Sequence, residues 1–310
     1  MQPLEITLGQ QVGQWIFILV PVLVFLVGVL FAWRNLRMRR GDTRGALRVA
    51  AFLLCCSLLR WAAFAHHVPM RSEYDGSTWA LSAALFLAAV FWVIYVAAEP
   101  YIRRRWPQSL ISWSRLVAGG FRDPLVGAHM LLGIVISIWF VLLSSVPYYW
   151  LRISGAINNF AQSSALDGVR RPIGLILNCV PVSIYYSLIV LFFFFLLRAL
   201  FRREWIAAPV VILLGAMLAG SSLHPVVDGV TNALGFALVV LVLIRFGVLP
   251  TTVLFFAYFL LGAFPMTADF SAWYAGISLA ITLLILAMAA FAFHSALGGR
   301  KLFQEGFLES

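Results

Sequence analysis

Long apolar runs, separated by short polar or basic segments, make up most of this chain. A helix needs about 20 apolar residues to cross the hydrocarbon core of a bilayer, and it satisfies its own backbone hydrogen bonds there. The pattern predicts nine such helices in a single integral membrane domain, residues 1–310. The approximate spans are 15–33, 47–64, 77–98, 128–146, 173–197, 206–223, 226–243, 249–266 and 273–293. The eighth is short and follows Pro250, so a re-entrant hairpin is the alternative there.

The composition agrees with this pattern. Hydrophobic residues are 63% of the chain, charged residues only 11%, and the mean hydropathy is +0.96. These values exclude an ordinary soluble globular domain. The first positive residue, Arg34, follows the first apolar run, so we expect that run to be kept as an anchor and not cleaved as a signal peptide. The predicted fold class is all-α, a polytopic transmembrane helical bundle.

The basic residues predict an orientation. If the N-terminus lies outside, 17 of the 22 Lys and Arg residues lie on the inner side, four lie outside, and Arg60 lies within the second span. Basic residues concentrate on the cytoplasmic side of membrane proteins. The expected topology is therefore N-terminus outside and C-terminus cytoplasmic. The same rule explains the net charge of +10, so nucleic acid is not an expected partner.

The stretch EPYIRRRWPQSLISWSRL, Glu99 to Leu116, predicts a helix at the inner membrane surface. At 100° per residue, an apolar face forms over residues 108–118, with Ser112 and Arg115 on a polar face. The apolar face contains Leu110, Trp113, Leu116 and Val117. Arginines before this helix are suited to anionic headgroups, at roughly 1 kcal/mol each. Lipid headgroups at the inner face are therefore the expected partners.

Several residues are candidates for binding a ligand or lipid. Arg60 is a formal charge inside a span, which is costly and often functional, although its side chain could instead snorkel outward. Glu99 is placed to pair with Arg103 at i+4, and Trp106 is placed as an interface anchor. The full candidate set is Arg60, Glu99, Arg103, Arg104, Arg105, Trp106, Trp113 and Arg115.

The histidines suggest metal or haem chemistry only weakly. His66, His67 and His224, with Asp228, are placed near the outer surface and have ligand types that suit a transition metal. No recognised metal-binding spacing accompanies them, so interfacial histidines are the alternative. His129 and His294, near the inner ends of their spans, are the pair that could ligate haem. We expect no cofactor, with metal or haem as the open alternative.

The strings RGDTRGALRVAAF, EPYIRRRWPQSLISWSRL, FRDPLVG, LIRFGVLP and HSALGGRKLFQEGFLES resemble the C-terminal multi-pass membrane region of a group of bacterial serine/threonine protein kinases. The resemblance implies a bacterial inner-membrane protein and a signalling context. The kinase domain itself is absent: the chain has no glycine-rich phosphate loop, and its only lysine is Lys301 near the C-terminus.

The expected function is a non-catalytic sensory, scaffold or anchoring module that meets a cytoplasmic signalling protein or another membrane subunit. A small-molecule or ion transporter or channel is one alternative. A haem- or metal-binding redox protein is the other.

The topology can be tested with single cysteines. In a cysteine-free background, we expect Gln108→Cys to react with a membrane-impermeant maleimide only from the cytoplasmic side, because the surrounding arginines should hold this tract inside. Asp75→Cys should react only from the outer side. Labelling of position 108 from outside would contradict the orientation.

Overall fold

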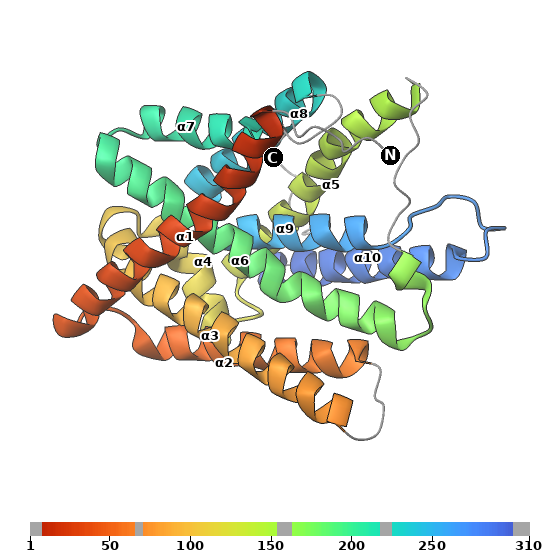
Figure 1. Cartoon of the computed structure of the whole chain (residues 1–310), viewed down its shortest axis with the longest axis horizontal. Helices are drawn as coiled ribbons and strands as arrows, with labels where there is room; N and C mark the ends of the chain where they lie inside the picture. The colour runs from red at the N-terminus through yellow and green to blue at the C-terminus, as the bar shows by residue number, and fades with distance from the viewer. Residues whose placement is uncertain (1–7, 66–70, 154–162, 218–224, 300–310) are drawn as a thin grey trace, which may run out of the picture.

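The computed structural model describes residues 8–65, 71–153, 163–217 and 225–299, and all regular structure in these ranges is helical (Figure 1). The elements are α1 (Leu8–Arg37), α2 (Thr43–Phe64), α3 (Arg71–Arg105), α4 (Gln108–Val117), α5 (Pro124–Ile153), the 3₁₀ helix η1 (Ser163–Leu166), α6 (Arg170–Phe201), α7 (Glu204–Met217), α8 (Pro225–Phe246), α9 (Val248–Ala263) and α10 (Ala275–Leu297). Each predicted span overlaps one of the α-helices, so the all-α prediction is confirmed.

Nine spans are not confirmed. In the described part of the chain, six helices are long and apolar enough to cross a membrane: α2, α3, α5, α6, α8 and α10. Helices α7 and α9 have 14 and 16 residues. At 1.5 Å per residue, α9 is about 24 Å long, which is less than the roughly 30 Å of a hydrocarbon core. The fold is thus that of a polytopic membrane protein in which short helices accompany the long ones.

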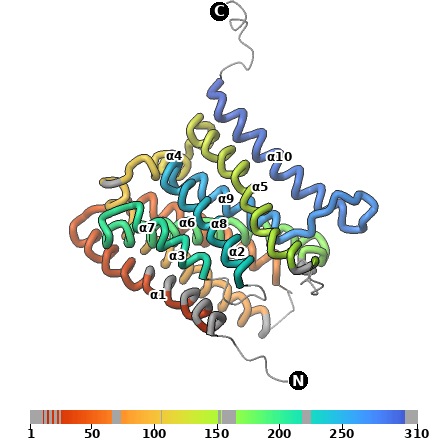
Figure 2. Tube along the Cα trace, turned by 90° about the horizontal axis from the view of Figure 1, so that it is seen from above, coloured from red at the N-terminus to blue at the C-terminus, as the bar shows by residue number. Residues whose placement is uncertain are grey.

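Helix α9 lies inside the bundle. It packs mainly on α5 and α6, and also contacts α4, α8 and α10 (Figures 1 and 2). Its first eight residues, Val248 to Phe255, are all buried. A helix that is covered by protein along its sides does not need to match the bilayer thickness, because those residues contact protein and not lipid. This explains why the eighth predicted span is short.

The turn into α9 depends on Gly247. This residue has φ +94°, a conformation that glycine adopts without steric cost. A Cβ atom here would also overlap the backbone of Ser109 at the start of α4. The close approach places α4 across the α8–α9 turn, so α4 is packed on protein and does not lie only on lipid.

A proline-induced defect in α3 is repaired by α1. Pro100 has no N–H group, so the carbonyl of Val96, one turn earlier, loses its helical hydrogen bond. The fully buried Asn35 of α1 donates its amide N–H to this carbonyl at 2.9 Å and to that of Ala97 at 3.1 Å. The end of α1 is therefore fixed to the proline site of α3.

The turn between α1 and α2 closes over the same site. Gly41 has φ +113°, and a Cβ atom added there would lie 3.4 Å from Cγ of Pro100. The backbone N–H of Asp42 donates to the buried Glu99 carboxylate at 3.1 Å. Asp42 in turn caps α2 by accepting from the Gly45 N–H at 2.8 Å. Helices α1, α2 and α3 thus meet at one polar junction.

We predict that Asn35→Leu destabilises the protein by about 1–3 kcal/mol, because it leaves a buried carbonyl without a donor. In a Pro100→Ala background, residue 100 regains the N–H that bonds Val96, so the same substitution should cost less than half as much. Denaturation in detergent, analysed as a double-mutant cycle, measures this coupling.

Asn232→Leu is the matched control for this cycle, because Asn232 is half-buried on α8 and makes no hydrogen bond to a described residue. Asn232→Leu should lower the free energy of unfolding only slightly, and by the same amount in both backgrounds. If Asn35→Leu lowers it equally with and without Pro100, Asn35 does not compensate for the missing N–H of the proline.

Candidate ligand-binding site

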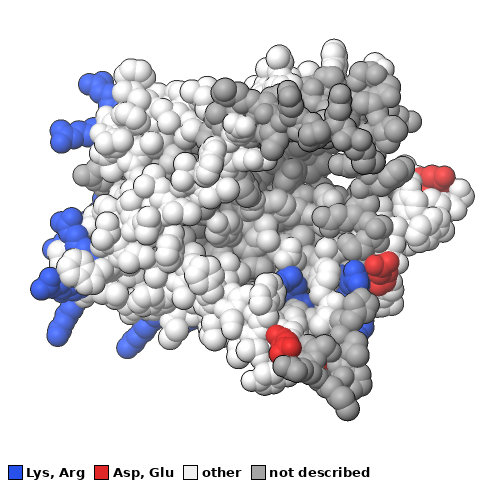
Figure 3. All heavy atoms as spheres, viewed as in Figure 1, with Lys and Arg blue, Asp and Glu red and all other residues white. Residues whose placement is uncertain are grey.

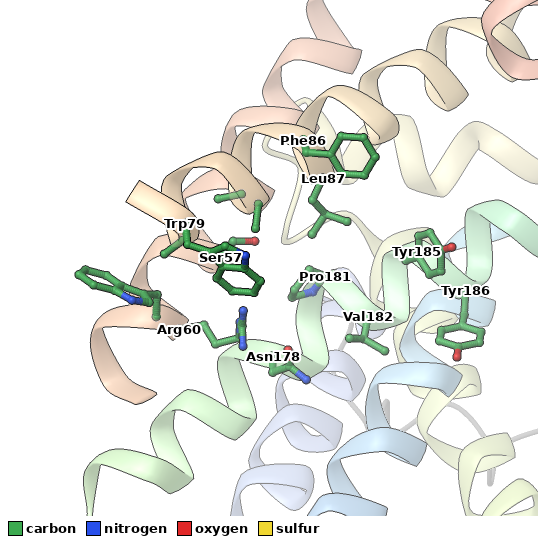
Figure 4. A pocket seen from close by; sticks show the side chains of 14 residues that line it. Ser57, Arg60, Trp79, Phe86, Leu87, Asn178, Pro181, Val182, Tyr185 and Tyr186 are labelled. Carbon is green, nitrogen blue, oxygen red and sulfur yellow. The ribbon is translucent and has the colours of Figure 1, made fainter. Parts of the chain in front are cut away.

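A pocket of about 470 Å³ opens between α2, α3 and α6 (Figure 4). Apolar and aromatic side chains form most of its wall, including Trp79, Phe86 and Leu87 of α3 and Pro181 of α6. The polar groups are few: Ser57, Arg60, Asn178 and the hydroxyls of Tyr185 and Tyr186. A concave, mostly apolar site with a few polar groups is typical of small-molecule pockets in proteins.

Arg60 supplies the charge in this pocket. Its side chain is half-buried, one turn before the end of α2, and no carboxylate in the described part of the chain forms an ion pair with it. Figure 4 shows Arg60 beside Asn178 at one end of the pocket, with Tyr185 and Tyr186 toward the other. A cation held at this depth without a counter-ion favours binding of an anionic group.

The pocket wall is firmly built on the α6 side. Tyr185 packs edge-on against Phe91 of α3, with ring centroids 6.0 Å apart, and Tyr186 packs against Phe259 of α9 at 5.2 Å. Pro181 stands between them and Asn178 on the same helix. These contacts fix the positions of the aromatic side chains, so the shape of the pocket is set by α3, α6 and α9 together.

Basic residues gather at the opposite end of α2 (Figure 3). Contacts between helix ends bring this region together: Gly41 with Pro100, Trp106 with Arg198, and Ser109 with Gly247. We call it the arginine-rich end. Its described members are Arg34, Arg37, Arg39, Arg40, Arg44, Arg48, Arg103, Arg104, Arg115, Arg122, Arg198, Arg202, Arg203 and Arg245.

The residues predicted to bind lipid are all at this end except Arg60. The expected i+4 ion pair is present, with Arg103 Nε 2.6 Å from Glu99 Oε1. Glu99 is buried and also bonds the Asp42 N–H, so it holds the junction together. Arg104 is exposed, and the side chain of Arg105 lies outside the described residues.

Trp106 and Trp113 are less exposed than surface anchors would be. The Trp106 ring packs against Phe194 of α6 at 5.7 Å, and the guanidinium of Arg198 lies 5.3 Å from its centroid. Trp113 is 3% exposed. Both tryptophans therefore attach the α3–α4 region to the bundle, a role that the sequence pattern alone did not indicate.

One prediction for α4 is wrong. Ser112, expected on a polar face, is fully buried, and its hydroxyl lies 2.8 Å from Nδ1 of His129 on α5. Arg115 is exposed as expected and binds Asp123 at 2.8 Å. The helix has protein on the Ser112 side because α5 and α9 pack there. The periodicity of apolar residues predicted the helix, but it could not show which helices pack against it.

Among the described residues, the structure shows no cluster of the predicted metal or haem ligands. His66, His67 and His224 lie outside the described residues, and Asp228 is in the first turn of α8. Within the described ranges, no group of three or more His, Cys, Asp and Glu side chains could hold a metal ion. His129 bonds Ser112, and His294 is exposed on α10. The cofactor alternative stays a prediction.

Comparisons with protein-family models, with curated proteins and with solved structures found no match to this chain. The kinase-associated resemblance thus stays a prediction.

The link between α4 and α5 predicts an acid-sensitive contact. Burial opposes ionisation of Asp123, but the Leu125 N–H and the Arg115 guanidinium outweigh it, so the pKa of this carboxyl is below its usual value. A lowered folded-state pKa stabilises the protein at neutral pH, and this contribution is lost as the pH falls below about 4. We expect Asp123→Asn to reduce the loss of thermal stability between pH 6 and pH 3.

The control is Asp75→Asn, since Asp75 is exposed and forms no ion pair with a described residue. This variant should lose as much thermal stability between pH 6 and pH 3 as the wild-type protein. If Asp123→Asn also loses as much as the wild-type protein, the α4–α5 contact does not depend on the charge of Asp123.

Proposed function

We propose that this protein is a non-catalytic sensory, scaffold or anchoring module of the bacterial inner membrane, and that it binds a small anionic amphiphile in the Arg60 pocket. The observation that carries the proposal is the half-buried Arg60 guanidinium, without a carboxylate partner in the described chain, in an otherwise apolar pocket of about 470 Å³. The chemistry of that pocket suits a ligand with an anionic head and an apolar body.

The path from the pocket to the arginine-rich end supports a sensory role. Helices α2 and α3 both line the pocket, and both enter the polar junction of Asp42 and Glu99 at their other ends. A ligand that separates α2 from α3 would act on this junction, because packed helices move as rigid units. The junction lies beside Arg103, which is 62% exposed and available to a partner.

In this proposal the arginine-rich end faces the cytoplasm, as the distribution of basic residues predicts. It would meet anionic headgroups and the acidic surface of a signalling protein, in keeping with the resemblance to kinase membrane regions. Exposed arginines steer such a partner through long-range attraction more than through tight contacts.

A transporter is the second candidate, and one observation favours it. The short α9 begins beside Ser109 at the arginine-rich end and stops before Phe264, whose backbone is extended, and discontinuous helices line the substrate sites of many transporters. Flux of a dodecyl-chain anion into vesicles that contain the protein would support a transporter over a sensory module.

The experiment uses dodecyl phosphate as the probe and the purified full chain in a neutral detergent. We expect dodecyl phosphate to raise the melting temperature of the wild-type protein and not that of Arg60→Leu, with Arg60→Lys keeping part of the shift because it keeps the charge. Dodecyl trimethylammonium, which has the opposite charge, should give no shift.

Hydrogen exchange separates sensing from simple anchoring. Binding of dodecyl phosphate should change exchange at the Asp42 and Thr43 amides, about 25 Å along α2 from Arg60. Arg170→Gln is the matched control, because Arg170 is exposed and donates to the Ala62 carbonyl near the same end of α2. Equal shifts in the wild-type and Arg60→Leu proteins would reject the proposal.

A further inference from the structure

A second cavity lies on the other side of α6, at the arginine-rich end. It has a volume of about 480 Å³ and is lined by residues of α2, α4, α5, α6, α9 and α10. We call it the α9 cavity. Where the Arg60 pocket is lined by Asn178, Pro181 and Val182 of α6, the α9 cavity is lined by Val180, Ser183 and Ile184. The two are therefore separate spaces.

The α9 cavity suits an apolar chain. It follows α9 from Leu249 to Phe256, eight residues whose seven helical steps cover about 10 Å. Its hydroxyls are already bonded, since Ser183 donates to the Val180 carbonyl and Thr252 shares a hydrogen bond with Ser187. An occupant therefore gains from apolar contact and not from hydrogen bonds deep in the cavity.

The cavity is open toward the membrane side of the bundle. Phe52 of α2 and Phe291 of α10 line it and are 52% and 44% exposed, and Phe121 before α5 is 58% exposed. Side chains that line a cavity and are also exposed mark its mouth. An acyl chain can enter from the bilayer without crossing the arginine-rich end.

A polar pocket of about 210 Å³ adjoins this cavity, and Arg48 and Val117 line both. Arg44 and Arg48, one turn apart on α2, are exposed, and neither forms an ion pair with a described carboxylate. Asp42 is the acid in this lining, and its carboxylate accepts the Gly45 N–H as a helix cap. Two guanidinium groups against one carboxylate leave a net positive pocket.

Trp113 and Tyr95 connect the two linings. Trp113 is 3% exposed and lines the α9 cavity, and its indole N–H interacts with the hydroxyl of Tyr95, which lines the polar pocket. The two side chains therefore hold α4 against α3 beside both spaces.

We infer that the arginine-rich end holds one anionic phospholipid. Its phosphate lies between Arg44 and Arg48, and one acyl chain fills the α9 cavity. The site differs from the Arg60 pocket in its helix faces and its charges, so it does not rest on the proposed function. The positive polar pocket suits an anionic headgroup, and the apolar α9 cavity suits an acyl chain. Both parts of the site therefore favour an anionic lipid.

Native mass spectrometry of the purified full chain tests this with palmitoyl-oleoyl phosphatidylglycerol and with phosphatidylcholine of the same chains. We expect one phosphatidylglycerol to bind preferentially. Arg44→Gln with Arg48→Gln should weaken its binding by about twenty- to thirtyfold, from two lost headgroup attractions.

The matched control is Arg203→Gln with Arg245→Gln, which removes two exposed arginines of the same end that do not line the site. This control should bind phosphatidylglycerol as the wild type does. An equal loss in both double variants would show diffuse surface attraction and overturn the site.

Two further results would overturn it. One is equal binding of phosphatidylcholine and phosphatidylglycerol. The other is displacement of the lipid by millimolar inorganic phosphate, which would show that the acyl chain contributes nothing to binding. If the arginine double variant does not fold, the selectivity of the wild-type protein for phosphatidylglycerol over phosphatidylcholine still decides the question.

Discussion

The carbonyl group of Val96 sets the arrangement of the first three helices. Pro100 removes its helical donor, and an unbonded carbonyl in a membrane-embedded bundle costs more than one that water can reach. Asn35 supplies the missing N–H, and this fixes the depth of α1 against α3. The turn that follows then lies where Gly41 and Asp42 meet Pro100 and Glu99. One missing hydrogen bond therefore locates the start of α2, on which both cavities depend.

The centre of the bundle follows a different constraint. Helix α9 is too short to span a bilayer, but its first half is enclosed by α5, α6 and α8, so its length is set by packing and not by membrane thickness. Ser187 of α6 and Thr252 of α9 share the buried hydrogen bond between the two helices. The cavity next to α4 lies along this first half of α9.

The sequence pattern predicted the helices well because apolar length and period are local properties. Each span overlaps an observed helix, and the i+4 pair of Glu99 with Arg103 is present. The pattern could not show what covers a helix, which is why Ser112 was placed on an exposed face although α5 covers it. It also missed Asn35, a lone polar residue at the end of an apolar run. Pro100, 65 residues later, was the available signal. It shows that the Val96 carbonyl lacks a helical donor, but it does not show which helix supplies the replacement.

Helix α2 connects the two ends of the bundle electrostatically as well as mechanically. Arg44 and Arg48 lie in its first turns, and Arg60 lies three turns beyond Arg48, so one helix carries cations toward both faces of the membrane. Its neighbour α6 separates the Arg60 pocket from the α9 cavity near Pro181, where the helical hydrogen bonding is interrupted. A ligand that moves either helix in one cavity must change the shape of the other, because close-packed interiors have little spare volume. Thermodynamic linkage then makes the effect reciprocal, so an anion at Arg60 and a lipid beside α9 would each alter the affinity for the other by the same factor.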